Sequence, residues 1–409
     1  MVVKTADDSP SNIRQAPPGT GNPLEVFVIF LKLGITSFGG PIAHLGFFQR
    51  EFVQRRAWIA DGAFGDLVAL CQLLPGPASS QVAMALGYLR TGISGAFAAW
   101  AGFAAPSAVL MVAAGYGFQA IPADSGFLHG LKIAAAAVVA QALWTMGRRF
   151  CPDRARVLLA AIAAGLITRL PLGWLQIPII VAGALFGRIF LQSGPEPPKE
   201  SNSDGVSGAT WVARSSLALF FALLLILPVA SIRARNHWIE LADAFYRTGA
   251  LVFGGGHVVL PLLESATVAK GWLTQNAFMA GYGAAQAVPG PLFSFAAYLG
   301  TVIGPTWVAG IWCLVWIYVP SFLLILGALP FWNALRRSAG VQAALRGANA
   351  AVVGILLAAF YNPVLIVAIN SAAALIIALV AFGLLQFQKC PPWLLVLLCG
   401  LAGLIFPGK

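Results

Sequence analysis

Long apolar segments follow one another along almost the whole chain, and short polar stretches separate them. Many of these segments are long enough for an α-helix to cross about 30 Å of hydrocarbon. Hydrophobic residues make up 59% of the 409 residues and charged residues only 10%, whereas a soluble domain carries about 25% charged residues. The pattern predicts an all-α polytopic membrane protein with about 13 hydrophobic segments.

Two polar stretches interrupt this pattern and indicate domain boundaries. Residues 1–23 are rich in Pro, Gly, Ser and Asp and lack the apolar core of a signal peptide, which predicts a disordered cytoplasmic tail. Residues 193–213 are typical of a polar linker, and residues 214–233 of one extra transmembrane segment. We therefore expect an N-terminal domain over 24–192 and a C-terminal domain over 234–409.

The two domains repeat one sequence at a nearly constant offset. "QLLPGP" at 72–77 lies over "QAVPGP" at 286–291, and Pro106-Ser107 lies over Pro320-Ser321. Chance similarity between apolar segments rarely keeps Gly, Pro, Gln and Trp in register over so long a stretch. We interpret the chain as a duplicated unit, which is a frequent architecture of secondary transporters.

The charges of equivalent loops indicate that the two copies have opposite orientations. Residues 148–156 carry four arginines and their counterpart 362–370 none, whereas 119–128 carry none and their counterpart 333–342 two. Basic loops stay in the cytoplasm, so equivalent loops of the two copies lie on opposite sides of the membrane. The one extra segment between the copies accounts for this inversion. The N-terminus is then cytoplasmic and the C-terminus periplasmic. The basic stretch 50–56 fits this topology only if the segments beside it enter the membrane and return.

Each copy contains a Pro-Gly-Pro break inside an apolar region. Proline removes a hydrogen-bond donor and interrupts the helix, which frees backbone groups at membrane depth. A pair of ordinary proline kinks is the alternative, but breaks that recur in inverted copies favour a transport site at the bilayer midplane. The candidate substrate-binding residues at the breaks are Gln72, Pro75, Gly76, Pro77, Ser79, Ser80, Gln286, Pro289, Gly290 and Pro291.

Glycine clusters, "SFGGPIAH" at 37–44 and "VFGGGHVV" at 252–259, precede the breaks. Neither matches a nucleotide-binding motif, so we expect no nucleotide cofactor and transport driven by a gradient. Close helix packing is one interpretation of the glycines, and an unwound backbone that faces an anion is the other. Under the second interpretation the candidate site also contains Gly39, Gly40, His44, Gly254, Gly255, Gly256 and His257. The two histidines would act as hydrogen-bond donors rather than metal ligands.

Several charged residues lie inside apolar segments at matched depths. Lys32 matches Arg247, and Lys132 matches Arg346. Because a buried basic residue costs roughly 2.5–3.5 kcal/mol on insertion scales, we assign the first pair to anion attraction and the second pair to a secondary basic role; snorkelling to the membrane surface is the alternative. Asp66 is the candidate for proton coupling, or else a solvated residue at a helix start.

Motifs in both halves resemble the long-chain chromate ion transporter family. They include "SFGGPIAHLGFF" and "ALCQLLPGPASSQVAMALGYLR" in the first half, and "FGGGHVVLPLLE" and "FMAGYGAAQAVPGPLFSFAAYLG" in the second. The resemblance covers roughly residues 24–355. It implies two homologous domains of opposite orientation in a bacterial inner membrane, and export of chromate from the cytoplasm that gives chromate resistance.

Three alternatives remain open at this stage. A carrier of sulfate or another tetrahedral oxyanion would use the same kind of site, and sulfate would then compete with chromate. An intramembrane enzyme would need a convergent nucleophile or acid–base set, which the sequence lacks beside the breaks. A passive anion channel would not concentrate its substrate. Beyond the lipid bilayer we expect no nucleic-acid partner and no cofactor; the sequence allows a homodimer.

Overall fold

The computed structural model describes residues 21–122, 125–170, 175–191, 210–253, 256–331, 338–388 and 390–406. Every regular element in these residues is a helix, which confirms the all-α prediction. The predicted tail at 1–23 and the predicted linker at 193–213 lie almost wholly outside the described residues.

The helices of the two repeats follow one another in the same order. In the first repeat they are α1 (Pro23–Thr36), α2 (Gly40–Phe48), η1 (Gln49–Arg55), α3 (Asp61–Leu73), α4 (Ala78–Thr91), α5 (Ile93–Gln119), α6 (Gly126–Phe150), α7 (Arg154–Arg169) and α8 (Gln176–Phe190). After α9 (Thr210–Ala234), the second repeat contains α10 (His237–Leu251), η3 (Gly256–Val258), α11 (Val259–Thr267), α12 (Gln275–Ala287), η4 (Leu292–Ser294), α13 (Phe295–Ile303), α14 (Trp307–Ala328), η5 (Leu329–Phe331), α16 (Ala339–Ala359), η6 (Phe360–Leu365), α17 (Ile366–Ala368), α18 (Ala372–Gln386) and α19 (Pro392–Ile405).

The boundaries of these helices follow the repeat in the sequence. The helices α3 and α12 begin and end at equivalent residues of the two copies, and α5 and α14 also begin at equivalent residues. The helix α9, which contains the predicted extra segment, lies between the repeats without a counterpart in the first. The duplication seen in the sequence is therefore a duplication of the fold.

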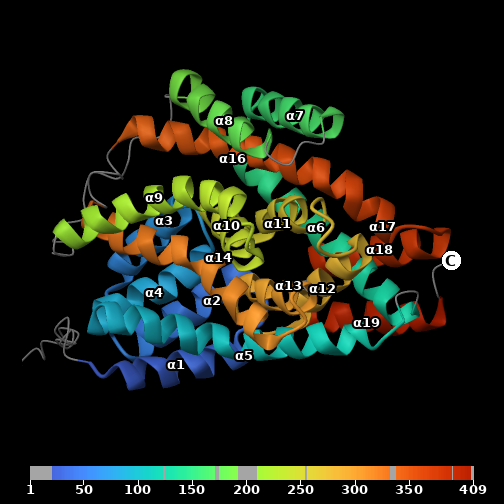
Figure 1. Cartoon of the computed structure of the whole chain (residues 1–409), viewed down its shortest axis with the longest axis horizontal. Helices are drawn as coiled ribbons and strands as arrows, with labels where there is room; N and C mark the ends of the chain where they lie inside the picture. The colour runs from blue at the N-terminus through green and yellow to red at the C-terminus, as the bar shows by residue number, and fades with distance from the viewer. Residues whose placement is uncertain are drawn as a thin grey trace, which may run out of the picture.

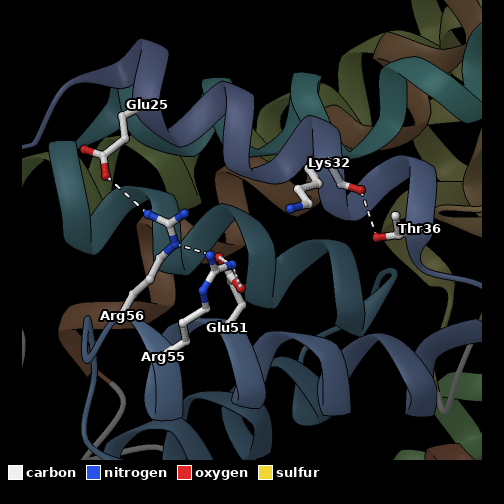
Figure 2. Close-up of polar contacts among 6 residues, drawn as sticks. All are labelled: Glu25, Lys32, Thr36, Glu51, Arg55 and Arg56. Carbon is white, nitrogen blue, oxygen red and sulfur yellow. Dashed lines mark hydrogen bonds and ion pairs between the residues drawn. The ribbon is translucent and has the colours of Figure 1, made fainter.

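The first two helices of the first repeat form a hairpin whose two ends lie together. Glu25, near the start of α1, pairs with Arg56, which follows η1, at 3.5 Å. Figure 2 shows this pair together with Glu51 and Arg55, apart from Lys32 and Thr36 further along α1. The chain thus enters along α1 and returns along α2 and η1.

The next two helices, α3 and α4, form a second hairpin that returns to the same end. The Arg90 guanidinium, at the end of α4, lies 5.1 Å from the ring centroid of Trp58, which precedes α3. Arg90 also lies 4.0 Å from Glu25, at the start of α1. Both helix pairs are therefore hairpins whose open ends lie together, which is the arrangement that the sequence predicts beside the basic stretch 50–56.

The second repeat contains the same two hairpins. The rings of His237, at the start of α10, and Trp272, after α11, lie 5.4 Å apart. The Tyr298 hydroxyl of α13 donates to the Ala277 carbonyl near the start of α12 at 2.9 Å. Each repeat therefore contains two hairpins whose open ends lie together.

The long helices that follow the hairpins run in opposite directions in the two repeats. Trp312, near the start of α14, donates from its indole N–H to the carbonyl of Trp238, near the start of α10, at 2.9 Å. Gln119, at the end of α5, lines a cavity with Thr274 and Asn276, at the start of α12. Thus α5 ends where α14 begins, as an inverted repeat requires.

The last helices of each repeat pack against the opposite repeat. Figure 1 shows α16 lying along α7 and α8 of the first repeat, while α6 runs toward α19 of the second. Glycines allow these backbones to approach closely: a Cβ on Gly187 would lie 2.2 Å from the Ala343 carbonyl, and one on Gly403 would lie 2.1 Å from the Gly126 carbonyl. The two repeats are consequently interlocked rather than merely adjacent.

Side chains cap several helices at the outer ends of the molecule. Asn22 accepts from the Leu24 N–H at the start of α1, and Asn236 caps α10 in the same way. Asp153 caps α7, and hydrogen bonds from Arg156 lower the pKa of its carboxyl. Such caps satisfy first-turn N–H groups that have no partner inside the helix.

Five helices in the described residues are long and apolar enough to cross a membrane, and they lie at 93–119, 126–150, 211–234, 307–331 and 339–368. Shorter apolar helices, among them α8, α18 and α19, accompany them. The chain is therefore a multi-pass membrane protein. Because the hairpin helices return to the side from which they enter, fewer than thirteen segments cross completely.

Candidate functional site

The four hairpin tips meet at the centre of the fold. We name them the first glycine tip (37–40), the first proline tip (75–77), the second glycine tip (252–256) and the second proline tip (289–291). The Gly76 N–H of the first proline tip donates to the Val252 carbonyl of the second glycine tip at 2.7 Å. The Gly290 N–H of the second proline tip donates to the Ser37 carbonyl of the first glycine tip at 3.0 Å.

These two hydrogen bonds are equivalent under the repeat. Gly76 and Gly290 are the central residues of the two Pro-Gly-Pro breaks, and Ser37 and Val252 both directly precede the Phe-Gly-Gly of the glycine clusters. Each proline tip is therefore held by the glycine tip of the other copy. The breaks and the glycine clusters, which lie far apart in the sequence, form one structural unit.

Glycine is required at the tips by backbone conformation as well as by space. Gly39, Gly40, Gly76 and Gly290 all have positive φ, between +76° and +123°, a region that residues with a Cβ rarely adopt. A Cβ on Gly76 would lie 2.6 Å from Gln81 Nε2 and 2.7 Å from Ser321 Oγ. Gly254 and Gly255 of the second glycine tip lie outside the described residues.

Two helices that leave the tips begin without side-chain caps. No side chain caps α2 or α4, whereas side chains cap the starts of α1 and α10. The first-turn N–H groups of α2 and α4 have no partner inside the helix. Because a helix N-terminus carries a partial positive charge, these groups favour an anion at the tips.

Buried polar side chains surround the first proline tip. Gln81 donates from Nε2 to the Pro75 carbonyl at 2.7 Å, while its Oε1 has no partner among the described residues. Ser321 Oγ, close to Gly76, is likewise buried without a partner. The buried His44 ring lies 3.4 Å from Ser79 Oγ and 3.2 Å from the Ser37 carbonyl. The Ser80 hydroxyl lies 3.3 Å from that of Tyr318.

The second proline tip has a matching but different set of neighbours. Ser107 Oγ lies 2.5 Å from Ser294 Oγ and donates to the Ala104 carbonyl at 3.0 Å. Gln286 Nε2 is buried without a partner among the described residues. His257 lies 2.9 Å from the Tyr282 hydroxyl. Hydroxyl, amide and imidazole groups therefore gather at both proline tips.

One cation that was not predicted from the sequence contacts the helix that leads into the first break. Arg149, at the end of α6, donates to Gln72 Oε1 at 2.5 Å, three residues before Pro75. Lys32 is exposed on α1 (Figure 2), and Arg247 is paired with the buried Asp243 one turn earlier in α10. Whether Lys32 and Arg247 attract an anion therefore stays a prediction.

The secondary basic residues lie toward opposite ends of the molecule. Lys132, on α6, donates to Asn276 Oδ1 at 3.2 Å and lines a cavity of about 510 Å³. Its counterpart Arg346, on α16, donates instead to the Leu191 carbonyl at 2.6 Å. The two residues thus have different partners although they occupy equivalent positions.

This difference belongs to a larger asymmetry between the repeats. In the second repeat α12 packs against α6, and a Cβ on Gly283 would lie 2.2 Å from the Leu131 carbonyl. In the first repeat α3 packs against α4 and η1 but does not lie along α16. Ala69 of α3, the counterpart of Gly283, is exposed, and Leu345 of α16, the counterpart of Leu131, is half-buried.

Asp66 lies on this partly exposed face of α3 and takes part in a polar interaction. Its proposed role in proton coupling stays a prediction. Among the described residues no cluster of three or more His, Cys, Asp or Glu side chains is arranged for a metal ion.

Several polar residues at the tips were not predicted from the sequence. Ser107 and Ser321 follow Pro106 and Pro320, and this register between the copies was visible in the sequence. Their position beside Gly290 and Gly76 was not visible, because α5 and α14 come from separate parts of each repeat. Gln81 and Arg149 offered no repeat signal at all, since Phe295 and Pro363 occupy their counterpart positions.

Comparison with known proteins identifies relatives along the whole chain. The sequence model described as chromate transporter matches residues 24–188 and 239–404. A chromate transport protein of Pseudomonas aeruginosa is 26% identical over 405 residues, which cover 96% of this chain and 94% of that protein. A chromate transport protein of Cupriavidus metallidurans is also 26% identical, over 96% of this chain and 95% of its own length.

A transporter of Methanocaldococcus jannaschii without an assigned substrate is 26% identical over 95% of this chain and 96% of that protein. No solved structure gives a significant match.

Proposed function

The chain belongs to the chromate transporter family, as its motifs suggested, and we propose that it is a gradient-driven secondary transporter that exports chromate from the cytoplasm. The relatives that carry the name chromate transport protein support chromate as the substrate. We place the protein in a bacterial inner membrane, with the N-terminus cytoplasmic and the C-terminus periplasmic, on the basis of loop charges. Export in this orientation would give chromate resistance.

The observation that carries this proposal is the reciprocal bonding of the four tips. A dianion that leaves water needs several short hydrogen-bond donors around it. The uncapped starts of α2 and α4 and the hydroxyl of Ser321 offer such donors close to the first proline tip. The N–H groups of Gly76 and Gly290 themselves are engaged between the tips, so their role is to hold the tips together.

The asymmetry of the repeats supports transport by alternating access. In inverted-repeat transporters one copy closes while the other opens around a fixed site. Here α12 is closed against α6, whereas the equivalent α3 stands away from α16. This arrangement corresponds to one of two states that would be related by exchanging the conformations of the repeats.

Uptake of radiolabelled chromate into everted membrane vesicles tests the proposal. We expect vesicles that contain the protein to concentrate chromate when energised, and an uncoupler to abolish this accumulation. Accumulation without any gradient dependence would contradict a secondary transporter, and equilibration without concentration would indicate a passive channel. Unlabelled sulfate measures selectivity: stronger competition by sulfate than by unlabelled chromate would make sulfate the preferred oxyanion.

The orientation is tested separately with reporter fusions. We expect a reporter at Arg336, which lies outside the described residues, and one in the loop 148–156 to report the cytoplasm. A periplasmic position of Arg336 would contradict the inverted repeat.

A further inference from the structure

A second polar cavity lies beside the second glycine tip and has no part in the tip cluster. Its volume is about 450 Å³, and it is lined by α7, α8, α11, α12, α16, η6 and α17. Its polar lining side chains are Thr168, Gln176, Glu264, Ser265, Gln275 and Asn362. The short helix η3 joins the second glycine tip to α11, which carries Glu264.

Glu264 is the one ionisable side chain among the residues that line this cavity. It lies within a re-entrant hairpin, and none of the described residues forms a hydrogen bond or an ion pair with its carboxyl group. A charged side chain is costly at membrane depth and is usually retained there for a purpose. Its counterpart in the first repeat is Arg50, which is exposed, so the carboxyl belongs to one copy only.

Two amide side chains of the cavity have unused hydrogen-bonding groups. Gln176 is only 5% exposed; its Nε2 donates to the Pro261 carbonyl at 3.3 Å, and its Oε1 has no partner among the described residues. Gln275 Nε2 is also buried without a partner there. An acceptor and a donor thus remain beside a carboxyl group in a space large enough for several water molecules.

The charged groups on the neighbouring elements are engaged elsewhere. On α10, Asp243 and Arg247 pair with each other. His257, before α11, contacts Tyr282, and Lys270, after α11, lies 4.5 Å from the ring centroid of Trp272. Arg346 of α16 donates to the Leu191 carbonyl, directly after α8. Arg169 of α7 and Arg188 of α8 are absent from the cavity lining. None of these groups is placed to fix the charge of Glu264.

We propose that Glu264 binds the proton that the transporter exchanges for its oxyanion, an inference that rests on the proposed function. The carboxylate takes up one proton from water in the cavity in one state and releases the same proton in the other state. Gln176 and Gln275 hold the water that carries it. Because η3 joins α11 to the second glycine tip, neutralising Glu264 changes the balance between the two conformations of that hairpin.

The test uses the purified full-length protein in proteoliposomes and two assays. Counterflow measures exchange of labelled for unlabelled chromate without a proton gradient. The second assay measures chromate accumulation driven by a pH gradient, together with proton movement reported by a trapped pH-sensitive dye. For Glu264→Gln we expect counterflow close to that of the parent protein, and gradient-driven accumulation reduced by at least about tenfold.

Glu240→Gln, at the partly exposed start of α10, is the matched control that should keep gradient-driven accumulation. Accumulation by Glu264→Gln at the parental level would overturn the proposal, as would loss of accumulation in Asp66→Asn alone, or accumulation driven by a sodium gradient instead of a proton gradient. Absence of counterflow in the parent protein would instead contradict the proposed function.

A second variant covers the case in which Glu264→Gln does not fold. Gln176→Leu keeps the carboxyl but removes an amide that lines the same cavity. We expect it to shift the pH at which gradient-driven transport is half-maximal, because the amide no longer interacts with the two forms of the carboxyl. An unchanged pH profile in this variant would contradict the assignment.

Discussion

Gly76 combines a left-handed backbone conformation with a site that has no room for a methyl group. Its φ is +123°, and a Cβ would overlap Gln81 and Ser321. We expect Gly76→Ala to lower chromate transport by about tenfold or more, because the tip must move away from Val252. Gly92→Ala is the control: Gly92 also has a positive φ, +70°, but a Cβ there would meet nothing within 4 Å.

Transport in the vesicle assay, normalised to the amount of protein in the membrane, measures this difference. Both variants place a Cβ at a positive φ, in backbone regions that cost a residue with a side chain about 1–3 kcal/mol. A deficit specific to Gly76→Ala therefore reports the tip contact. Equal transport by the two variants would reduce the proline tips to ordinary kinks.

Arg247 cannot be examined by a single substitution, because it neutralises the buried Asp243. Removing one partner of a buried ion pair costs about 3–5 kcal/mol, and we expect less here because the Arg247 side chain is 33% exposed. Arg247→Ala should thus lower membrane abundance. The double variant Asp243→Asn with Arg247→Gln should restore abundance.

Transport by the double variant then measures the contribution of the cation alone. Lys32→Ala gives the equivalent measurement in the first repeat, because Lys32 has no acidic partner among the described residues. Full activity in both would assign Lys32 and Arg247 to roles outside substrate attraction. Low abundance of the double variant would show that the pair has a structural role beyond charge neutralisation.

The residue types at the tips could be predicted from the sequence, whereas the contacts of the charged side chains could not. Gly76 and Gly290 could be predicted because the need for a positive φ at a Pro-Gly-Pro break is local to the chain. The contact between Arg149 and Gln72 joins residues 77 positions apart, and the direction of the Lys32 side chain depends on which face of α1 is covered. Such features follow from tertiary packing, which sequence periodicity does not specify.

At the scale of elements, the re-entrant hairpins could be inferred from one inconsistency. The basic stretch 50–56 conflicted with a topology of complete crossings, and the contacts of Arg56 and Arg90 with Glu25 explain it. The packing of α7 and α8 against α16, and of α18 and α19 against α6, could not be inferred from the sequence. It depends on glycines that meet only after folding, such as Gly187 against α16.

This packing gives a prediction within one helix. A Cβ on Gly130 of α6 would lie 2.1 Å from the Cys399 carbonyl of α19, whereas one on Gly147 of the same helix would meet nothing within 4 Å. Overpacking typically costs about 1–3 kcal/mol, while glycine inside a helix is less stable than alanine by roughly 0.5–1 kcal/mol. Gly130→Ala should therefore destabilise the protein, and Gly147→Ala should not.

Thermal unfolding of both variants in the same detergent measures the difference. Equal midpoints would mean that α6 and α19 are not held in close contact in the membrane protein.

At the scale of the whole molecule, the structure combines one closed and one open helix pair. Lys132 of α6 reaches Asn276 of α12, but the equivalent Arg346 and Gly62 have no such contact among the described hydrogen bonds. If the repeats exchange conformations, α3 must close against α16 when α12 leaves α6. The site at the tips is then open to one side of the membrane at a time.

Disulfide trapping of the helix pair that is open here tests this account most directly. In a transport-active variant without the five native cysteines, we introduce Ala69→Cys with Leu345→Cys. A disulfide needs Cα atoms within about 7 Å, which the described structure does not offer but the exchanged state does. We predict that oxidation in membranes forms this bond, stops chromate transport, and that reduction restores it. Normal transport by a variant that never forms the bond under oxidation would contradict alternating access between the repeats.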